Sequence, residues 1–276
     1  MKTLIVPTDF SPAAENAAIY ATDLGIAIQA DLLLLNVVQI PVTVVEVALT
    51  ENEYEEMLQE AIKSLAELRA QLLVHAGTGK ITIRTKVVVG TIEFELEQAC
   101  KQEKPYLVIM GTKESGSTER LLIGSNTLYA ARNMHYPLFI IPQNMKYGGI
   151  HHIALACDLE TIYDVPVDKL QELSKLFEAT LSIIHISKNK AEELASTAPL
   201  HLLSHRFKEC KPELYYSINE NIAQGIIDAS DKLQLDMLII LNRKLDFFQK
   251  LFHKSSSKPL ILHPVVPLVI MQSELV

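Results

Sequence analysis

The sequence predicts an α/β fold made of two tandem, doubly wound domains, each with a five-stranded parallel sheet. Short apolar runs without polar alternation are typical of parallel strands that helices cover on both faces. Amphipathic stretches of helical period separate these runs, and the whole pattern occurs twice. The order β-α-β-α-β-α-β-α-β follows for each copy. We expect domain 1 at residues 1–144 and domain 2 at 150–276, joined by a short linker.

The internal repeat is the strongest of these observations. Residues 4–9 have a counterpart 149 residues later in 153–158, and both apolar runs end in Asp. A second match at the same offset, 30–37 with 179–186, makes chance an improbable explanation. Farther along, the offset shortens to about 130, which places 106–111 over 237–242 and 136–141 over 266–271.

The elements of the first copy follow in order. After the strand at 4–9, Ser11 is the expected N-cap of a helix with Pro12 at its first position, where no N–H is lost. The strand at 30–37 follows. A second helix is expected to open at Thr50 with a capping box that is closed by Glu53.

The last strand of each copy, 136–142 and 266–271, is apolar and follows a proline. An apolar strand at an open sheet edge promotes aggregation unless it is paired. We therefore expect the two copies to pack through these strands as an intrachain pseudo-dimer.

Composition excludes several classes of protein. Lys and Arg number 25 against 33 Asp and Glu, a formal net charge of -8, and no basic block offers a nucleic-acid surface. No apolar run reaches the roughly 18 residues of a membrane span, and the opening MKTLIVPTDF does not resemble a signal peptide. Three widely spaced cysteines suit reduced thiols. We expect a cytoplasmic protein without nucleic-acid or membrane partners.

Glycine is distributed unevenly, and this locates the candidate site. Nine of the 10 glycines lie at or before Gly149, and only Gly225 follows. In open α/β sheets, ligands bind at the carboxyl ends of the strands, where helix N-termini attract anions. We expect Asp9 toward a sugar or base and backbone N–H groups around the glycines on phosphates. The candidate residues are Pro7, Thr8, Asp9, Val37, Met110, Gly111, Gly124, Ser125 and Asn126.

The chain resembles the universal stress protein family, in a tandem form that covers nearly all 276 residues. The resemblance rests on VPTDFS, LLLLNV and VIMGTKESGSTERLLIGSNTLYAARNMHYPLFIIP. It implies a fold like that of the adenine nucleotide alpha hydrolases. It also implies ATP, with Mg²⁺, bound by a loop of the form G-x2-G-x9-G-S/T/N, by the Asp after the first strand and by a Val after the second.

One position departs from that loop. Gly111, Gly124 and Ser125 match it, but Glu114 occupies the place of the second glycine. Two like charges about 4 Å apart repel by roughly 1 kcal/mol in water and about 4 kcal/mol at an intermediate dielectric. We therefore expect ATP binding in domain 1 to be weak or absent.

The second copy departs further. Its equivalent of the loop, 242–256, contains no glycine, and Phe247, Phe248 and Phe252 would fill space that phosphates need. We expect domain 2 to be architectural, or to bind a partner protein.

The leading hypothesis is a non-enzymatic stress-response protein with a weakened ATP or AMP site in domain 1. A slow ATPase or nucleotide-dependent enzyme on the same fold is the first alternative, with Lys113, Glu114 and Ser125 as the nearby reactive groups. Association of two chains into a homo-oligomer stays open.

A metal-binding or small-ligand-binding stress protein that uses the His and Cys residues of domain 2 is the second alternative. His201 and His205 are four residues apart, which places both on one helix face, and Cys210 follows. His151 and His152 with Cys157 are a second set. Ordinary surface or partly buried side chains are the favoured interpretation of both sets, so no metal site is predicted.

Overall fold

The computed structural model describes residues 2–40, 50–115, 120–122, 124–159, 162–242, 254–255, 258–259 and 266–272. Only the backbone is described for four short strands, β5 (Lys113–Ser115), β6 (Arg120–Leu122), β12 (Lys254–Ser255) and β13 (Lys258–Pro259). The chain divides into two compact units. Unit 1 comprises Met1–Thr112 and Gly124–Tyr147, and unit 2 comprises Lys113–Ile123 and Gly148–Val276. The domain boundaries at 144 and 150 stay predictions.

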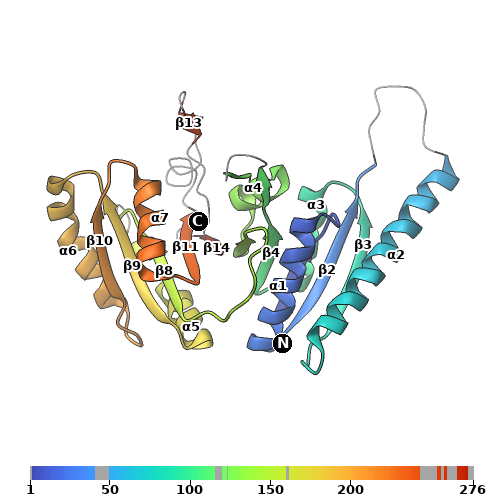
Figure 1. Cartoon of the computed structure of the whole chain (residues 1–276), viewed down its shortest axis with the longest axis horizontal. Helices are drawn as coiled ribbons and strands as arrows, with labels where there is room; N and C mark the ends of the chain where they lie inside the picture. The colour runs from blue at the N-terminus through green and yellow to red at the C-terminus, as the bar shows by residue number, and fades with distance from the viewer. Residues whose placement is uncertain are drawn as a thin grey trace. The chain divides into compact units, whose positions relative to one another are not determined.

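Unit 1 is a doubly wound α/β unit (Figure 1). Its sheet has the order β3-β2-β1-β4-β7, with all neighbours parallel. Helix α1 contacts α2, and α3 contacts α4, as expected for a helical layer on each face. The elements are β1 (Lys2–Pro7), α1 (Pro12–Ile28), β2 (Ala30–Val38), α2 (Glu51–Ala76), β3 (Ile83–Val89), α3 (Ile92–Glu103), β4 (Leu107–Gly111), α4 (Ser125–Asn133) and β7 (Leu138–Ile141).

Unit 2 repeats this topology. Its sheet has the order β10-β9-β8-β11-β14, again with all neighbours parallel. The elements are β8 (His152–Ala156), the short 3-10 helix η1 (Ile162–Asp164), α5 (Val167–Phe177), β9 (Thr180–Ser187), α6 (Lys190–Arg206), β10 (Glu213–Ile218), α7 (Ile222–Leu233), β11 (Met237–Asn242) and β14 (Leu268–Gln272). The predicted α/β class with mostly parallel sheets is confirmed.

The repeat extends to single backbone hydrogen bonds. Thr8 N donates to Leu35 O at 2.9 Å, and Cys157 N, 149 residues later, donates to Ile184 O at the same distance. Near the fourth strand of each unit the offset is 130, as in the bonds Val108 N to Pro137 O and Leu238 N to Pro267 O, both 2.9 Å. Both offsets predicted from the sequence are therefore present in the strand pairing.

The strands form the core of each unit. All six residues of β11 are buried, as are four of the five residues of β4, so neither strand alternates apolar with polar side chains. This burial explains why the strands are continuous apolar runs in the sequence.

The predicted helix starts are confirmed. Ser11 Oγ accepts from Ala14 N at the start of α1, and Pro12 is the first residue of that helix. At α2, Thr50 and Glu53 make the reciprocal bonds of a capping box.

Two predicted segments differ from the structure. The first strand ends at Pro7 instead of Asp9, because Phe10 adopts a left-handed φ of 59° and its N–H donates to Thr8 Oγ1. The segment between Gly111 and Gly124 was expected to be a loop, but within it β5 pairs antiparallel with β6, with Glu114 opposite Leu121. A three-residue strand carries too little periodicity to be predicted from the sequence.

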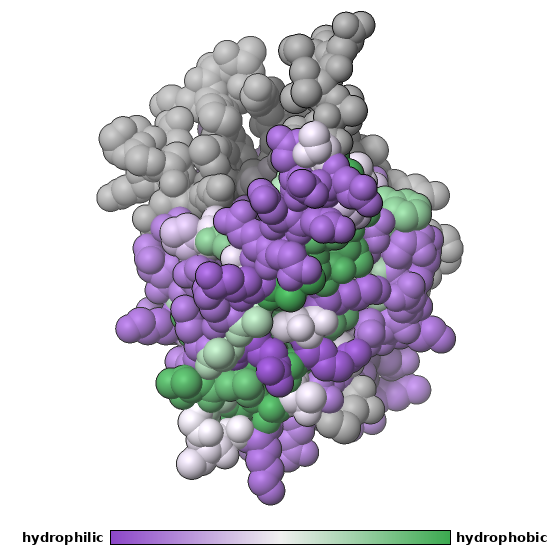
Figure 2. Space-filling model, turned by 90° about the vertical axis from the view of Figure 1, so that its right-hand side faces the viewer, coloured by the Kyte–Doolittle hydropathy of each residue, from purple (hydrophilic) through white to green (hydrophobic). Residues whose placement is uncertain are grey.

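Helix α2 has a polar outer face, and the side of the molecule over α2 and β3 is mostly hydrophilic (Figure 2). Its buried residues, Ala61, Leu65, Leu68 and Leu72, lie on one stripe. The acidic start of the helix is explained by solvation and the helix dipole, without a binding role.

No helix in the part of the chain that the structure describes is long and apolar enough to cross a membrane. The intrachain pseudo-dimer stays a prediction from the sequence.

Candidate functional site

The first predicted site residues lie at the carboxyl ends of β1 and β2. Thr8 is buried, and its carbonyl oxygen accepts from the Asn36 side-chain amide at 2.9 Å, which ties the two strand ends together. Asp9 is exposed, and its Oδ1 accepts from Ser11 N at 3.0 Å in the turn that leads into α1. The turn therefore presents a carboxylate to solvent beside the start of a helix.

Gly111 ends β4 and packs closely against the first turn of α1. A Cβ at Gly111 would lie 2.2 Å from the carbonyl oxygen of Ala13, a distance far shorter than any real contact of a Cβ atom. From the sequence, the role expected of this glycine is close approach of the backbone to phosphate, and strand-to-helix packing requires a glycine there independently.

Gly124 is different, because it is the N-cap of α4 and no side chain caps the helix there. Its φ of -59° is ordinary, and a Cβ would meet nothing within 4 Å among the described residues. Gly124, Ser125 and Asn126 are all exposed. The Thr127 hydroxyl donates to Gly111 O at 3.4 Å, so the uncapped helix start lies next to the end of β4. An uncapped, exposed helix N-terminus attracts anions.

The remaining predicted residues have other surroundings. Pro7 and Met110 are buried, and Val37 is half-buried opposite Val88 of β3. Asn126 lines a groove of about 230 Å³ between α3 and α4, together with Tyr129. The structure thus places Asn126 at a separate groove on unit 1.

Cys100 lies in the same groove. Burial raises the pKa of its thiol to about 12, with a smaller contribution from the charge of Glu97. At neutral pH the thiol is protonated and therefore unreactive.

Thr112 lies at the edge of the candidate site, directly after β4, and was not among the residues predicted from the sequence. Its hydroxyl is buried and has no hydrogen-bond partner among the described residues, while its N–H donates to Ile141 O at 3.0 Å. It directly follows Gly111, and no sequence signal distinguishes it from a core threonine. An unpaired buried hydroxyl is costly, so this position favours a polar partner.

Two predicted features lie outside the described residues. The backbone of Glu114 belongs to β5, but its side chain is not described. Residues 243–253, which hold Phe247, Phe248 and Phe252, are likewise outside.

The metal-site alternatives gain no support. Among the described residues, no group of three or more His, Cys, Asp or Glu side chains could hold a metal ion. His201 and His205 are exposed on α6. The ring of His152 is engaged with protein, with Nδ1 2.9 Å from Leu233 O and Nε2 2.7 Å from Ser182 Oγ.

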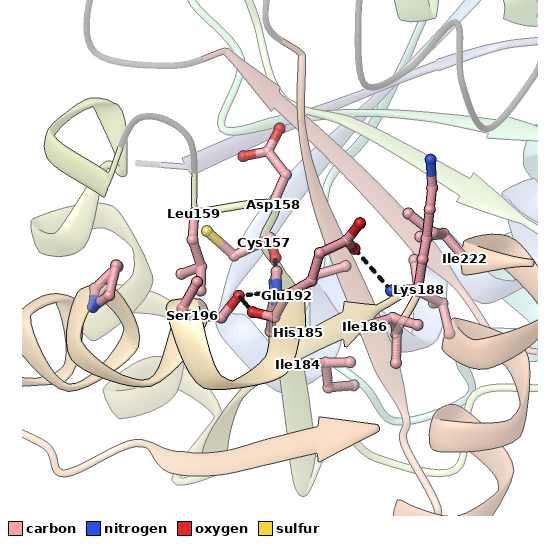
Figure 3. Close-up of a pocket in the computed structure, with 14 residues that line it drawn as sticks. Cys157, Asp158, Leu159, Ile184, His185, Ile186, Lys188, Glu192, Ser196 and Ile222 are labelled. Carbon is pink, nitrogen blue, oxygen red and sulfur yellow. Dashed lines mark hydrogen bonds between the residues drawn. The ribbon is translucent and has the colours of Figure 1, made fainter. Parts of the chain in front are cut away.

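Unit 2 contains a cavity of about 410 Å³ at the carboxyl ends of β8 and β9 (Figure 3). The imidazole of His185 lies in its wall, with Nδ1 donating to Cys157 O at 2.8 Å and Nε2 2.8 Å from Ser196 Oγ. This bridge matches the Asn36–Thr8 bridge of unit 1 at an offset of 149 residues. Imidazole has replaced an amide at an equivalent position, which the aligned repeat could have revealed.

The comparisons decide the family. The family model described as the universal stress protein family matches residues 1–142, about half of the chain. The chain belongs to the universal stress protein family. A universal stress protein of Methanocaldococcus jannaschii is 25% identical over 150 residues, which cover 52% of this chain and 84% of the relative.

Solved structures extend the likeness in fold over both units. A universal stress protein from Archaeoglobus fulgidus matches with a TM-score of 0.76 at 15% identity, covering 98% of each chain. One from Pseudomonas aeruginosa, described as a putative universal stress protein, matches with a TM-score of 0.60 at 11% identity, covering 99% of this chain and 94% of that one. This universal stress protein therefore has the family fold along nearly its whole length.

Proposed function

We propose that the chain is a non-enzymatic, cytoplasmic stress-response protein that binds an adenine nucleotide weakly in unit 1. The observation that carries this proposal is the uncapped and exposed start of α4, where Gly124 makes no side-chain cap bond. Its first backbone N–H groups have no partner within the helix, so they can donate to phosphate oxygens.

The surroundings of α4 fit such a ligand. The start of the helix is tied to the end of β4 through Thr127 and Gly111, and the exposed Asp9 carboxylate follows β1, the strand next to β4. The unpaired Thr112 hydroxyl adds a polar group that a ligand could satisfy. Mg²⁺ would arrive with ATP, as the counterion of its phosphates.

Weak binding follows from Glu114, which replaces a glycine of the family loop. A carboxylate in that loop repels the phosphates by about 1 to 4 kcal/mol, which lowers affinity about five- to a thousandfold.

The non-enzymatic part rests on the reactive groups near α4. Among the described residues, the Ser125 hydroxyl has no hydrogen-bonded His or carboxylate that could act as its base. Nucleophilic catalysis needs such an activating partner. Colorimetric phosphate release from ATP over several hours checks this part, and steady turnover that disappears in Ser125→Ala would contradict it.

Calorimetry with Mg²⁺ and ATP tests the binding. We expect wild type to bind more weakly than micromolar, and Glu114→Gly to bind about five- to a thousandfold more tightly than wild type. Glu114→Gln is the matched control, because it removes the charge and keeps the side chain. Equal affinity of wild type and Glu114→Gly would show that Glu114 is not the cause.

Gly124→Asp tests the location of the site. Aspartate is a good N-cap, so the variant should fold at least as stably as wild type, while its carboxylate occupies the helix N–H groups and repels phosphate. Nucleotide binding that survives this substitution would place the site elsewhere.

For unit 2 we propose an architectural or partner-binding role, without nucleotide binding. Its equivalent of the loop lacks glycine. Titration of the Gly124→Asp variant with ATP checks this, because any remaining binding would have to come from outside the unit 1 site.

A further inference from the structure

The cavity of unit 2 is built mainly from apolar side chains. Ile184 and Ile186 of β9 and Ile222 and Ile226 of α7 contribute to its lining, together with Pro199 of α6. Ile184 and Ile226 are almost fully buried, whereas Leu159, Pro199 and Ile222 are half-buried and supply the exposed part of the apolar lining. A surface of this kind favours an apolar group of a ligand.

The cavity wall has few polar groups, and hydrogen bonds within the protein hold the Ser196 hydroxyl among them in place. Ser196 Oγ is 2.8 Å from His185 Nε2 and 2.7 Å from Glu192 O, and its one proton can serve only one of these two contacts. Outside the cavity lining, the Ser187 hydroxyl lies on the same face of β9 as His185 and is buried without a hydrogen-bond partner among the described residues. Hydrogen-bonding capacity therefore remains at this end of the sheet.

Helix α6 contributes a backbone acceptor. Pro199 lies inside the helix and has no N–H, so the carbonyl of Ala195 lacks its usual donor four residues later. Both residues line the cavity. A carbonyl that lacks its helix donor suits an ammonium or other N–H group.

The rim carries charges of both signs. The carboxylates are Asp158 and Glu192, and the ammonium is Lys188. The Glu192 carboxylate accepts from Lys188 N at 2.9 Å and from the Asn189 side chain at 3.2 Å, and Asp158 also has a partner within the protein. Lys188 Nζ makes no ion pair in the part of the chain that the structure describes. In Figure 3 the side chains of Asp158 and Lys188 point in the same direction from the cavity.

We propose that unit 2 binds a small zwitterion with an apolar side chain, of the chemical class of the apolar amino acids. The side chain lies on the exposed apolar lining at Leu159, Pro199 and Ile222, the ammonium group faces Asp158 and the Ala195 carbonyl, and the carboxylate faces Lys188. A polyphosphate is disfavoured, because the lining has one more carboxylate than ammonium groups.

Calorimetry of the full chain with L-phenylalanine tests the proposal. We expect one molecule bound per chain. Phenethylamine lacks the carboxylate and 3-phenylpropanoate lacks the ammonium. Each should bind at least about tenfold more weakly than L-phenylalanine, since each loses a charge-assisted hydrogen bond. Absence of binding up to millimolar L-phenylalanine would overturn the proposal.

Variants locate the ligand. Ala195→Trp puts a large side chain at the cavity from an exposed helix position and should lower affinity at least about tenfold. Ala191→Trp, exposed on the same helix but outside the cavity lining, should leave affinity unchanged. Equal effects of the two variants would contradict the location.

Charge variants test the ligand class. Lys188→Met should weaken L-phenylalanine and leave phenethylamine unaffected, whereas Asp158→Asn should weaken both and leave 3-phenylpropanoate unaffected. Displacement of L-phenylalanine by ATP in the Gly124→Asp background would show a nucleotide site instead. Because Gly124→Asp removes the proposed nucleotide site of unit 1, a failure of L-phenylalanine to bind in unit 2 can be told apart from a failure of ATP to bind in unit 1.

Discussion

At the scale of single residues, two glycines that the family loop treats alike have different physical roles. Gly111 is required by packing, because a Cβ would overlap the Ala13 carbonyl at 2.2 Å. Gly124 has open space around it among the described residues and an ordinary φ. Its lack of a side chain instead leaves the helix start accessible.

Alanine at each position separates these roles. Gly111→Ala should lower the free energy of unfolding by about 1 to 3 kcal/mol, as for other overpacked sites. Gly124→Ala should lower it by about 0.5 to 1 kcal/mol, because alanine is a poorer N-cap than glycine but its Cβ would overlap no described atom there. Urea unfolding of both variants measures the difference, and equal losses would refute the assignment.

The three thiols also differ in surroundings. Cys100 and Cys157 are buried, whereas Cys210 is half-exposed, with a thiol pKa raised mainly by partial burial. Ellman's reagent should therefore react quickly with one thiol per native chain, and with all three in denaturant. The fast reaction should disappear in Cys210→Ser, and a second fast thiol in wild type would contradict the burial.

At the scale of elements, the two copies share the position of a side chain that bridges two strands, but the chemical type of that side chain differs. Asn36 and His185 both connect the second strand of a unit to the end of the first, one with an amide and the other with an imidazole. The alternation of strands and helices and the capping residues of α1 and α2 were predictable, because they depend on local patterns.

The cavity of unit 2 and the unpaired Thr112 hydroxyl could not be predicted in this way. Both depend on how side chains from separate elements pack, as where Ser196 of α6 meets His185 of β9. The packing role of Gly111 could not be predicted for the same reason, since Ala13 is far from it in sequence.

Pro199 is an unfavourable residue in the interior of α6. Pro199→Ala should raise the free energy of unfolding by about 1 to 2 kcal/mol, since the roughly 3 kcal/mol gain in helix propensity is partly offset by lost packing. Pro12→Ala, at the first position of α1, is the control and should give no gain. Thermal unfolding compares the two, and a loss of stability in Pro199→Ala would be the contrary result.

An ion pair joins the edge strand β3 to α3, with Arg84 Nη2 2.6 Å from Glu103 Oε2. The hydrogen bond from Arg84 lowers the pKa of Glu103 in the folded chain. The stabilisation is therefore present above the ordinary pKa of glutamate and lost as pH falls through the lowered folded value.

Glu103→Gln should cost less than about 1 kcal/mol at neutral pH, because the pair is partly exposed, and the cost should vanish in acid. Glu67→Gln, from an exposed pair 4.0 Å apart, is the control and should have no measurable effect. Urea unfolding across pH checks both, and a Glu103→Gln cost that persists in acid would contradict the ion pair as its origin.

At the scale of the whole molecule, this universal stress protein is a duplicated fold whose two copies differ where we propose their binding sites. Unit 1 keeps Gly111, Gly124 and an open helix start, while unit 2 has a cavity with an imidazole in its wall. The uneven distribution of glycine in the sequence reflects this divergence.

The stoichiometry of ATP binding to Glu114→Gly tests this account most directly. With the repulsive charge removed, calorimetry should give one ATP per chain, and the added substitution Gly124→Asp should abolish it. Two ATP molecules per chain, or binding that persists in the double variant, would contradict the claim that only the first copy keeps a nucleotide site.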